Sequence, residues 1–452
     1  MLSLTGLLPD PAGDRSVLAH GIGGARDLPI SPELAIAGAV AALIVSFTVL
    51  TLAWRSPRYD AATSGRPAPR ALAAVVDAPA FAVVLRVVGM ALFLFTAWTA
   101  VFGEDLLINP FFGMFYVLLW VGIVPASLLF GPVWRAISPV RTLNRLLGMV
   151  TGSDPGQGLL TYPARLGYWP AAIGLFAFVW LELVFSQSTE LGPVRLWCAA
   201  YVAVMLVGGA LFGDAFYEQA DPFEVYSTLV GKLSVWGRRD GMLVVRSPLA
   251  NLDTVVARPG LVAVVAVLFG STAYDSFQDS SVWLRFTQAH LDQARLLDNV
   301  ALLAFCVGVG AIFAVGCATT GVEVSQRRWA LPDLFAHSVV PIIVGYIAAH
   351  YLSYFVEVGQ QTLILMSDPM SQGSNLLGTA DLAVNYWLSY HPTFLATSKV
   401  VAVVLGHVLG VVAAHDRALK ILPRRHQVTG QLPLLLAMVA FTVGGLYLLF
   451  AS

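Results

Sequence analysis

The chain has 452 residues, of which 57% are hydrophobic and 12% charged, and its formal net charge is −1. Soluble domains carry roughly 25% charged residues, so this composition excludes an ordinary water-soluble protein, and no nucleic-acid partner is expected. The three cysteines, Cys198, Cys306 and Cys317, all lie inside apolar runs, which excludes a disulfide scaffold and a paired-cysteine metal site.

The first 32 residues lack the basic and apolar regions of a cleaved signal peptide, and we expect them to form an extracytoplasmic N-terminal segment. Residues 33–452 are predicted to be one all-α domain, a polytopic transmembrane helix bundle. Apolar runs near the ~20 residues that a span requires occur ten times along the chain, at 33–54, 79–103, 111–130, 168–187, 195–213, 260–277, 299–321, 334–357, 394–415 and 431–450.

The distribution of basic residues predicts the orientation of this bundle. Nineteen Lys and Arg residues lie in the loops 55–70, 131–167, 214–259, 322–333 and 416–430, whereas five lie in the segments on the other side. Cytoplasmic loops hold the excess of basic residues, so both termini are predicted to be extracytoplasmic in a plasma membrane. Arg86 and Lys399 are the basic residues left inside spans, and Arg86 is close enough to the inner end of its helix to snorkel.

Two inner segments mix apolar and basic positions, at 133–150 and 222–236, within the longer connections 131–167 and 214–259. This pattern predicts amphipathic helices along the cytoplasmic face of the bilayer. The same pattern also fits short helices packed under the bundle. On the outer side, 358–393 is the longest connection, and long loops are often functional.

Ionisable residues inside spans are functional candidates, because a charge at mid-bilayer costs at least ~2.5–3.5 kcal/mol. In the eighth span, Tyr346, His350, Ser353 and Glu357 lie on one helix face. In the ninth, Lys399 and His407 are eight residues apart. If these spans are antiparallel neighbours, we predict a salt bridge between Glu357 and Lys399 and facing rings of His350 and His407 about two turns deeper.

Glu182 and Asp275, near the outer ends of the fourth and sixth spans, add two carboxylates to the outer half of the bundle. Three interpretations remain open at this stage. The polar residues can be interhelical ion pairs that fix helix order, a proton or substrate pathway, or a metal or catalytic site. For the last, His350, His407 and Glu182 are the candidate ligands of a divalent metal, with Glu357, Lys399 and Asp275 as catalytic groups. His350 and His407 are also candidate haem ligands.

Six runs of the chain resemble a family of actinobacterial multi-pass membrane proteins known as fenitrothion hydrolases. The runs are AHGIGGARDLP at 19–29, WVGIVPASLLFGPVWRAISPVRTL at 120–143, YPARLGYWPAAIGLFAFVWLELV at 162–184, ARPGLVAVVAVLFGSTAYDSF at 257–277, FAHSVVPIIVGYIAAHYLSY at 335–354 and GHVLGVVAAHDRAL at 406–419. The resemblance implies hydrolysis of an organophosphorus ester, for which metal-bound hydroxide is the usual nucleophile. His350, His407 and His415 lie in the resembling runs.

The sequence therefore leads to three functional hypotheses. The first is a metal-assisted membrane hydrolase of apolar organophosphorus esters that reach it from the lipid. The second is a proton-coupled carrier or channel that uses Glu357, Lys399 and the histidines as a proton-linked path. The third is a non-catalytic membrane subunit that anchors a protein partner.

Overall fold

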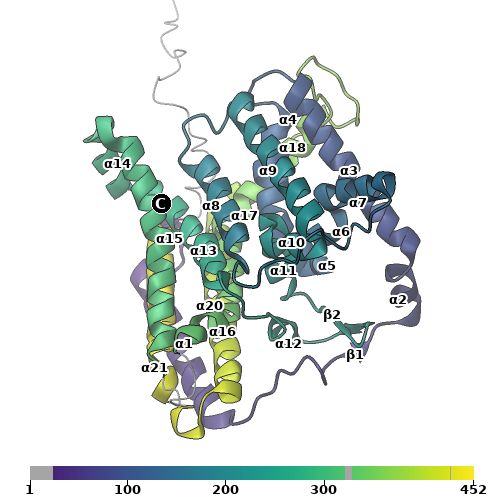
Figure 1. Cartoon of the computed structure of the whole chain (residues 1–452). Coiled ribbons are helices and arrows are strands. Elements are labelled where there is room, and N and C mark those ends of the chain that lie inside the picture. The colour runs from purple at the N-terminus through teal and green to yellow at the C-terminus, as the bar shows by residue number, and fades with distance from the viewer. Residues whose placement is uncertain (1–23, 321–327, 428, 452) are drawn as a thin grey trace, which may run out of the picture.

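The structure, a computed structural model, describes residues 24–320, 328–427 and 429–451 (Figure 1). In this part of the chain, eight helical segments are long and apolar enough to cross a membrane. They are α1 (Pro32–Ala53), α3 (Pro79–Phe102), α9 (Leu191–Phe212), α13 (Leu261–Gln278), α15 (Ala294–Ala318) with the turn before it, the segment Arg328–Leu365, α20 (Pro392–Ile421) and α21 (Leu432–Ala451) with the turn before it. These helices confirm a multi-pass membrane bundle. Most of the predicted N-terminal segment (residues 1–23) and part of the loop 322–333 lie outside the described residues.

Two of the ten predicted spans differ from a straight transmembrane helix. The third consists of Pro110–Val121 followed by α5 (Ile123–Phe130), with a 41° bend between them, and counts as a ninth spanning element if the bent pair is one span. The fourth is helical only in α8 (Trp169–Leu183), whose 15 residues extend about 22 Å. The structure therefore supports eight or nine spanning helices by length, in place of ten.

The loops predicted to share the basic side do meet at one end of the bundle, which we call the basic end. Backbone hydrogen bonds join Tyr168 to Pro259, and Asp416 accepts from the backbone amide of Arg58. At the opposite end, the amide of Leu191 donates to Asp105. The segment before α8 thus lies at the basic end and the segment after it at the opposite end, so α8 runs from one end of the bundle to the other.

Burial separates central from peripheral helices. In α13, 83% of the most apolar window is buried inside the protein, whereas in α3 the share is 6%. α13 packs against α8, α15 and α17 (Val340–Ser353), while α3 contacts α9 and the short α6 (Val133–Ile137) and α7 (Pro139–Thr151) at the edge (Figure 1). A helix that is apolar on all sides but exposed fits contact with lipid. Polar residues on α13 and α17 are therefore enclosed by protein.

The predicted neighbours α17 and α20 are in contact, because glycines allow their backbones to approach closely. A Cβ on Gly406 would lie 2.5 Å from the carbonyl oxygen of Pro341, and one on Gly345 would lie 3.2 Å from Cα of Gly406. These approaches fix the register of the pair. His407 lies level with about residue 341, so it is roughly 13 Å from His350 along the helix axis. The predicted ladder is therefore wrong in register by about two turns.

A small β-sheet at the basic end was not predicted. Its strand order is β1 (Arg66–Pro67), β3 (Met242–Val245), β2 (Trp236–Arg239), and all pairs are antiparallel. The turn between β2 and β3 places Asp240 and Gly241 at positive φ, which suits an Asp-Gly hairpin turn. The sheet links the loop after α1 with the loop before α12 (Pro248–Leu252) and closes the basic end (Figure 1).

The two segments predicted as amphipathic helices differ from each other. α7 buries Arg141, Asn144 and Gly148 and exposes an apolar face of Leu146, Leu147, Met149 and Val150, as expected at a membrane interface. By contrast, α11 (Pro222–Gly231) is buried over almost its whole length against α5, α6, α8 and α10 (Asp214–Ala220). For α11 the prediction of a surface helix is wrong, and the alternative of a packed helix is confirmed.

A candidate proton site between α8, α13 and α17

A buried hydrogen-bonded network joins α13 to α17. Oδ2 of Asp275 accepts hydrogen bonds from Nε2 of His350 at 2.9 Å and from the hydroxyl of Tyr351 at 2.5 Å. The other imidazole nitrogen, Nδ1, lies 3.1 Å from Oγ of Ser276, and the hydroxyl of Tyr346 donates to the same Oγ at 3.1 Å. We call these five residues the Asp275 network. All five are buried.

Helix geometry explains how the network forms. Tyr346 and His350 are four residues apart in α17 and therefore share the face toward α13. Asp275 and Ser276 lie near the C-terminal end of α13. Each of them contacts one of the two ring nitrogens of His350. A third donor, Nε2 of Gln278, binds Oδ1 of Asp275 at 2.7 Å. Charge-assisted hydrogen bonds of this kind offset the loss of water around a buried carboxylate.

The serine hydroxyl allows the network to hold His350 with either one or two protons. The hydroxyl of Ser276 lies 3.2 Å from the carbonyl oxygen of Thr272, to which it can donate. Oγ then accepts from Nδ1 of a doubly protonated imidazole. When the hydroxyl donates to Nδ1 instead, the imidazole is neutral and still donates from Nε2 to Asp275. Both states keep two hydrogen bonds on the ring.

Glu182 on α8 brings a second carboxylate to this region. The residue is partly exposed, but its Oε2 is buried and has no hydrogen-bond partner among the described residues, and its charge acts on Asp275. Tyr116, Tyr226 and Tyr354 lie close enough to interact with the Glu182 charge. A buried carboxyl oxygen without a hydrogen-bond partner lowers the stability of the fold by about 1–3 kcal/mol or more. A role in holding helices together by hydrogen bonds therefore does not explain Glu182.

Two of these tyrosines come from π-helical segments. Tyr116 lies in Gly113–Val121 and Tyr354 in Tyr354–Val358, and the two segments contact each other. The hydrogen bonds of a π-helix span five residues, one more than in an α-helix, and such turns are frequent at functional sites. The second π-helix also displaces the residues after His350, among them Glu357, from the regular α-helical stripe that the sequence predicted.

Glu357, Lys399 and His407 are placed elsewhere. Both Glu357 oxygens accept from the Ser389 hydroxyl, at 2.7 and 2.8 Å, and the Ser389 amide donates to Oε1 at 3.1 Å. The predicted ion pair between Glu357 and Lys399 is not among the ion pairs of residues 24–320 and 328–427. The charge of Asp27 acts on Lys399 instead. Nδ1 of His407 lies 2.8 Å from the carbonyl oxygen of Val403 in its own helix.

The predicted metal ligands therefore do not converge. Within the described residues, no group of three or more His, Cys, Asp or Glu side chains is arranged to hold a metal ion. His350 uses both ring nitrogens within the Asp275 network, and its axial offset from His407 of about 13 Å is too large for two axial haem ligands. The ionisable side chains near one another are Asp275 and His350, which are hydrogen-bonded, and Glu182, whose charge interacts with that of Asp275.

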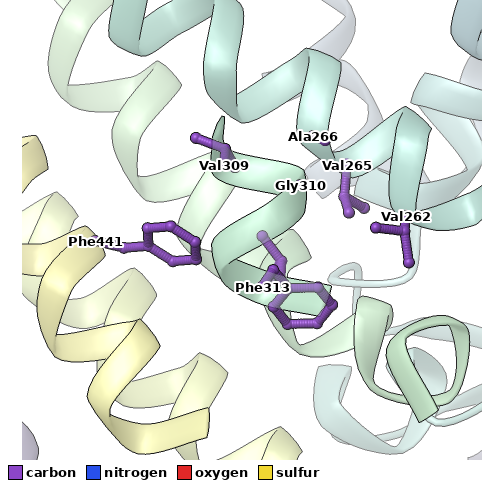
Figure 2. A pocket seen from close by; sticks show the side chains of 8 residues that line it. Val262, Val265, Ala266, Val309, Gly310, Phe313 and Phe441 are labelled. Carbon is purple, nitrogen blue, oxygen red and sulfur yellow. The ribbon is translucent and has the colours of Figure 1, made fainter. Parts of the chain in front are cut away.

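A small apolar pocket lies away from this site. Its lining consists of Val262, Val265, Val309, Gly310, Phe313 and their neighbours (Figure 2), and its empty volume of about 170 Å³ includes space open to solvent. Ligand pockets usually contain a few precisely placed polar groups, and this one has no polar side chain. On α13 it lies nine residues or more before Asp275, or roughly 13 Å along the axis. It is a packing gap and gives no access to the Asp275 network.

Sequence reasoning found four of the six site residues, with Tyr346 as part of the polar stripe in the eighth span, and missed two. Glu182, Asp275 and His350 stood out as ionisable residues in spans, and the structure brings them together. Ser276 and Tyr351 were not singled out, although each directly follows a predicted residue. The polar run Ser271, Thr272, Asp275, Ser276 near the end of α13 is the signal that marks this stretch as enclosed by protein.

Comparisons with family models, with curated proteins and with solved structures find no match for this chain. The functional argument therefore depends on the geometry described above.

Proposed function

We propose that this multi-pass membrane protein is a proton-coupled carrier or proton-conducting channel, with Glu182, Asp275 and His350 as its proton-binding site. The observation that carries the proposal is the unpartnered Oε2 of Glu182 beside the fully hydrogen-bonded Asp275. Chains of Asp, Glu and His inside a membrane are typical of proton relays. A purely structural role requires the Asp275–His350 pair but not a second carboxyl group.

The hydrogen bonds suggest an order for proton transfer. A proton taken up by Glu182 passes to Asp275 and from there to Nε2 of His350 in its neutral Nδ1–H tautomer, which becomes an imidazolium. The imidazolium then donates from Nε2 to the Asp275 carboxylate and from Nδ1 to Oγ of Ser276, whose own hydroxyl donates to the carbonyl oxygen of Thr272, and release of one proton returns the ring to its neutral state. Tyr346 holds Ser276 in place for this step. Loss of either carboxyl group interrupts the sequence.

Proton flux into proteoliposomes tests the proposal. The purified full-length protein is reconstituted, a potassium diffusion potential is imposed, and internal pH is followed with a trapped dye. We expect flux through the wild type and at least about tenfold slower flux through Glu182→Gln and Asp275→Asn, because proton-transfer groups typically contribute 10²–10⁴-fold. Asp298→Asn is the control, since Asp298 is equally buried but binds Tyr274 and Trp283. Wild-type flux in both variants would contradict the proposal.

A carrier that moves protons only together with its substrate shows no flux in this assay. For that case, infrared difference spectra between acidic and neutral pH test whether Glu182 binds a proton. We expect a protonated-carboxyl band in the wild type that loses one component in Glu182→Gln and is unchanged in Asp298→Asn, while the component from Asp221 remains in both variants. A band that is absent from the wild type, or unchanged by Glu182→Gln, would show that Glu182 does not bind a proton.

Ester hydrolysis is a second candidate, favoured by the resemblance to fenitrothion hydrolases and by one observation. Ser276, His350 and Asp275 are hydrogen-bonded in series, as in hydrolases with a serine nucleophile. In this mechanism Oγ of Ser276 attacks phosphorus, His350 takes the hydroxyl proton, and the aryloxide leaves. Mass spectrometry after incubation with an apolar phosphotriester should then find Ser276 phosphorylated, and Ser276→Ala should abolish turnover. An unmodified Ser276 would leave the proton pathway as the better explanation.

We further propose that the chain crosses the plasma membrane ten times, with both termini extracytoplasmic. Two observations support this topology. The basic loops, which hold 19 of the 26 Lys and Arg residues in the sequence, converge at one end. α8 connects the two ends although it is short.

A further inference from the structure

Two arginines near the basic end lack an acidic partner. Arg86 on α3 and Arg145 on α7 lie close enough for each charge to act on the other, and neither is among the ion pairs or side-chain hydrogen bonds of the described residues. Both side chains are half-buried. Repulsion between two such cations persists unless an anion lies between them.

Close packing of α3 on α6 holds the two arginines together. Gly89 touches the carbonyl group of Ile137 so closely that no other residue fits there, and α3 also packs against α7. Arg86 is three residues before Gly89 and so lies on the same face of α3. Arg145 is four residues after the buried Arg141 on α7, on the side that faces the bundle.

The nearby acids are already bound to other arginines. Glu224 accepts from Nε of Arg141 at 2.5 Å and from its Nη2 at 2.7 Å, and Asp214 accepts from Nη1 of Arg141 at 2.5 Å. Glu218 pairs with Arg135 at 2.7 Å. These three carboxylates are thus occupied by two arginines. Burial, followed by the charge of Arg86, lowers the pKa of Arg145, and the opposite effect of the Asp214 charge does not cancel this shift.

We propose that Arg86 and Arg145 together bind the phosphate group of an anionic phospholipid. The site is at headgroup depth, because Arg86 is seven residues from the start of α3, or about 10 Å from the basic end of the helix. Beside it, the exposed apolar face of α7 offers Leu146, Leu147, Met149 and Val150 to the acyl chains. Basic pockets between transmembrane helices commonly hold lipid phosphates, and two arginines give a phosphate several charge-assisted donors.

Native mass spectrometry tests this site on the purified full-length protein. We expect the wild type to retain phosphatidylglycerol in preference to phosphatidylcholine when the two are titrated in detergent. Arg86→Gln/Arg145→Gln should reduce the apparent affinity for phosphatidylglycerol by about tenfold or more, because the charge-assisted hydrogen bonds are lost. Arg238→Gln is the matched control, since this arginine is also at the basic end but pairs with Asp77 at 2.6 Å. Equal retention by the double variant and the wild type would overturn the proposal.

The single variant Arg145→Gln provides a second readout that does not depend on the double variant folding. Without lipid, it should melt at a higher temperature than the wild type, because one of two repelling charges is gone. With phosphatidylglycerol, the wild type should gain more in melting temperature than Arg145→Gln. Equal gains would overturn the proposal. Inorganic phosphate is titrated in parallel, and stabilisation of the lipid-free wild type equal to that by phosphatidylglycerol would show a site for free phosphate, not for lipid.

Discussion

Buried carboxylates in this protein differ in how completely their oxygens are hydrogen-bonded. Asp275 accepts from Gln278, His350 and Tyr351, whereas Oε2 of Glu182 accepts from no described residue. Asp221, at the start of α11, accepts from the indole of Trp134, the hydroxyl of Tyr201 and the amide of Phe223. At the scale of single residues, Glu182 differs from Asp275 and Asp221 because one of its oxygens has no hydrogen-bond donor.

Asp221 should make stability depend on pH. Burial, followed by the charge of Glu224, raises the pKa of Asp221 to about 7, above its value of roughly 3.9 in an unfolded chain. The folded state therefore holds this proton more tightly, so the free energy of unfolding should fall as pH rises from about 4 to 7. The loss is at most about 4 kcal/mol. The free energy of unfolding is measured with urea for the wild type and Asp221→Asn at pH 4.5 and 7.5. Between these pH values it should fall less in the variant than in the wild type.

A control for this prediction is Asp368→Asn. Asp368 accepts from Gln372, Gly373 and Ser374, and these hydrogen bonds lower its pKa, so its contribution has the opposite sign. The variant should keep the fall in stability between pH 4.5 and 7.5. The same pH dependence in Asp221→Asn and the wild type would rule out Asp221 as its source.

At the scale of elements, helix pairing depends on small residues at a few contacts. The approach of α17 and α20 uses Gly345, Gly406 and Gly410, and the approach of α3 to α6 uses Gly89. In lipid there is little hydrophobic force between helices, so close van der Waals packing and hydrogen bonds select the partner and its register. This is why α20 meets α17 about two turns away from the register that polar spacing alone predicted.

Gly406→Leu should therefore strongly destabilise the bundle. Its Cβ would lie 2.5 Å from the carbonyl oxygen of Pro341, a backbone atom that cannot move without separating α17 from α20. We expect a loss of roughly 3 kcal/mol or more, as for overpacking in a core, and a lower melting temperature in detergent. Gly308→Leu on α15 is the matched control, because nothing lies within 4 Å of its Cβ. Similar melting temperatures for the two variants would show that α17 and α20 do not depend on this contact.

At the scale of the whole molecule, the two ends of the bundle have different constructions. The basic end is closed by the small β-sheet, α10 to α12 and ion pairs such as Lys420 with Asp253 at 2.8 Å. The opposite end carries the loop after α18 (Gly359–Leu365), in which Ser367 and Asn375 hydrogen-bond. An excess of Lys and Arg in the loops of one end is what the membrane potential and the anionic inner leaflet favour.

The proposed topology predicts which side each loop faces. Single cysteines are introduced by Ser153→Cys, after α7, and by Gln187→Cys, after α8, and cells are treated with an impermeant maleimide. Gln187→Cys should react in intact cells, and Ser153→Cys only after permeabilisation, because α8 separates them. Of the native cysteines, Cys306 and Cys317 are buried and Cys198 is partly exposed, so both variants are made in a Cys198→Ser background. Reaction of both positions from the same side would show that α8 does not cross.

The sequence by itself determined the membrane class, the helix positions and the convergence of the basic loops at one end. These follow from local composition, because each span is recognised by its own apolar run and each loop by its own charges. It also identified Glu182, Asp275 and His350 as unusual, since an ionisable residue inside an apolar run is costly wherever the helix lies.

Only the tertiary structure decided which of these residues meet. His350 binds Asp275 and Ser276 on α13, not His407 on α20, because glycine contacts set the register of α17 and α20. Burial of α11 and the pairing of β1 with β3 join segments that are far apart in the chain. No local sequence pattern predicts the burial of α11 or the pairing of β1 with β3. Contacts between helices in lipid depend on a few close approaches and not on a periodic pattern in the sequence.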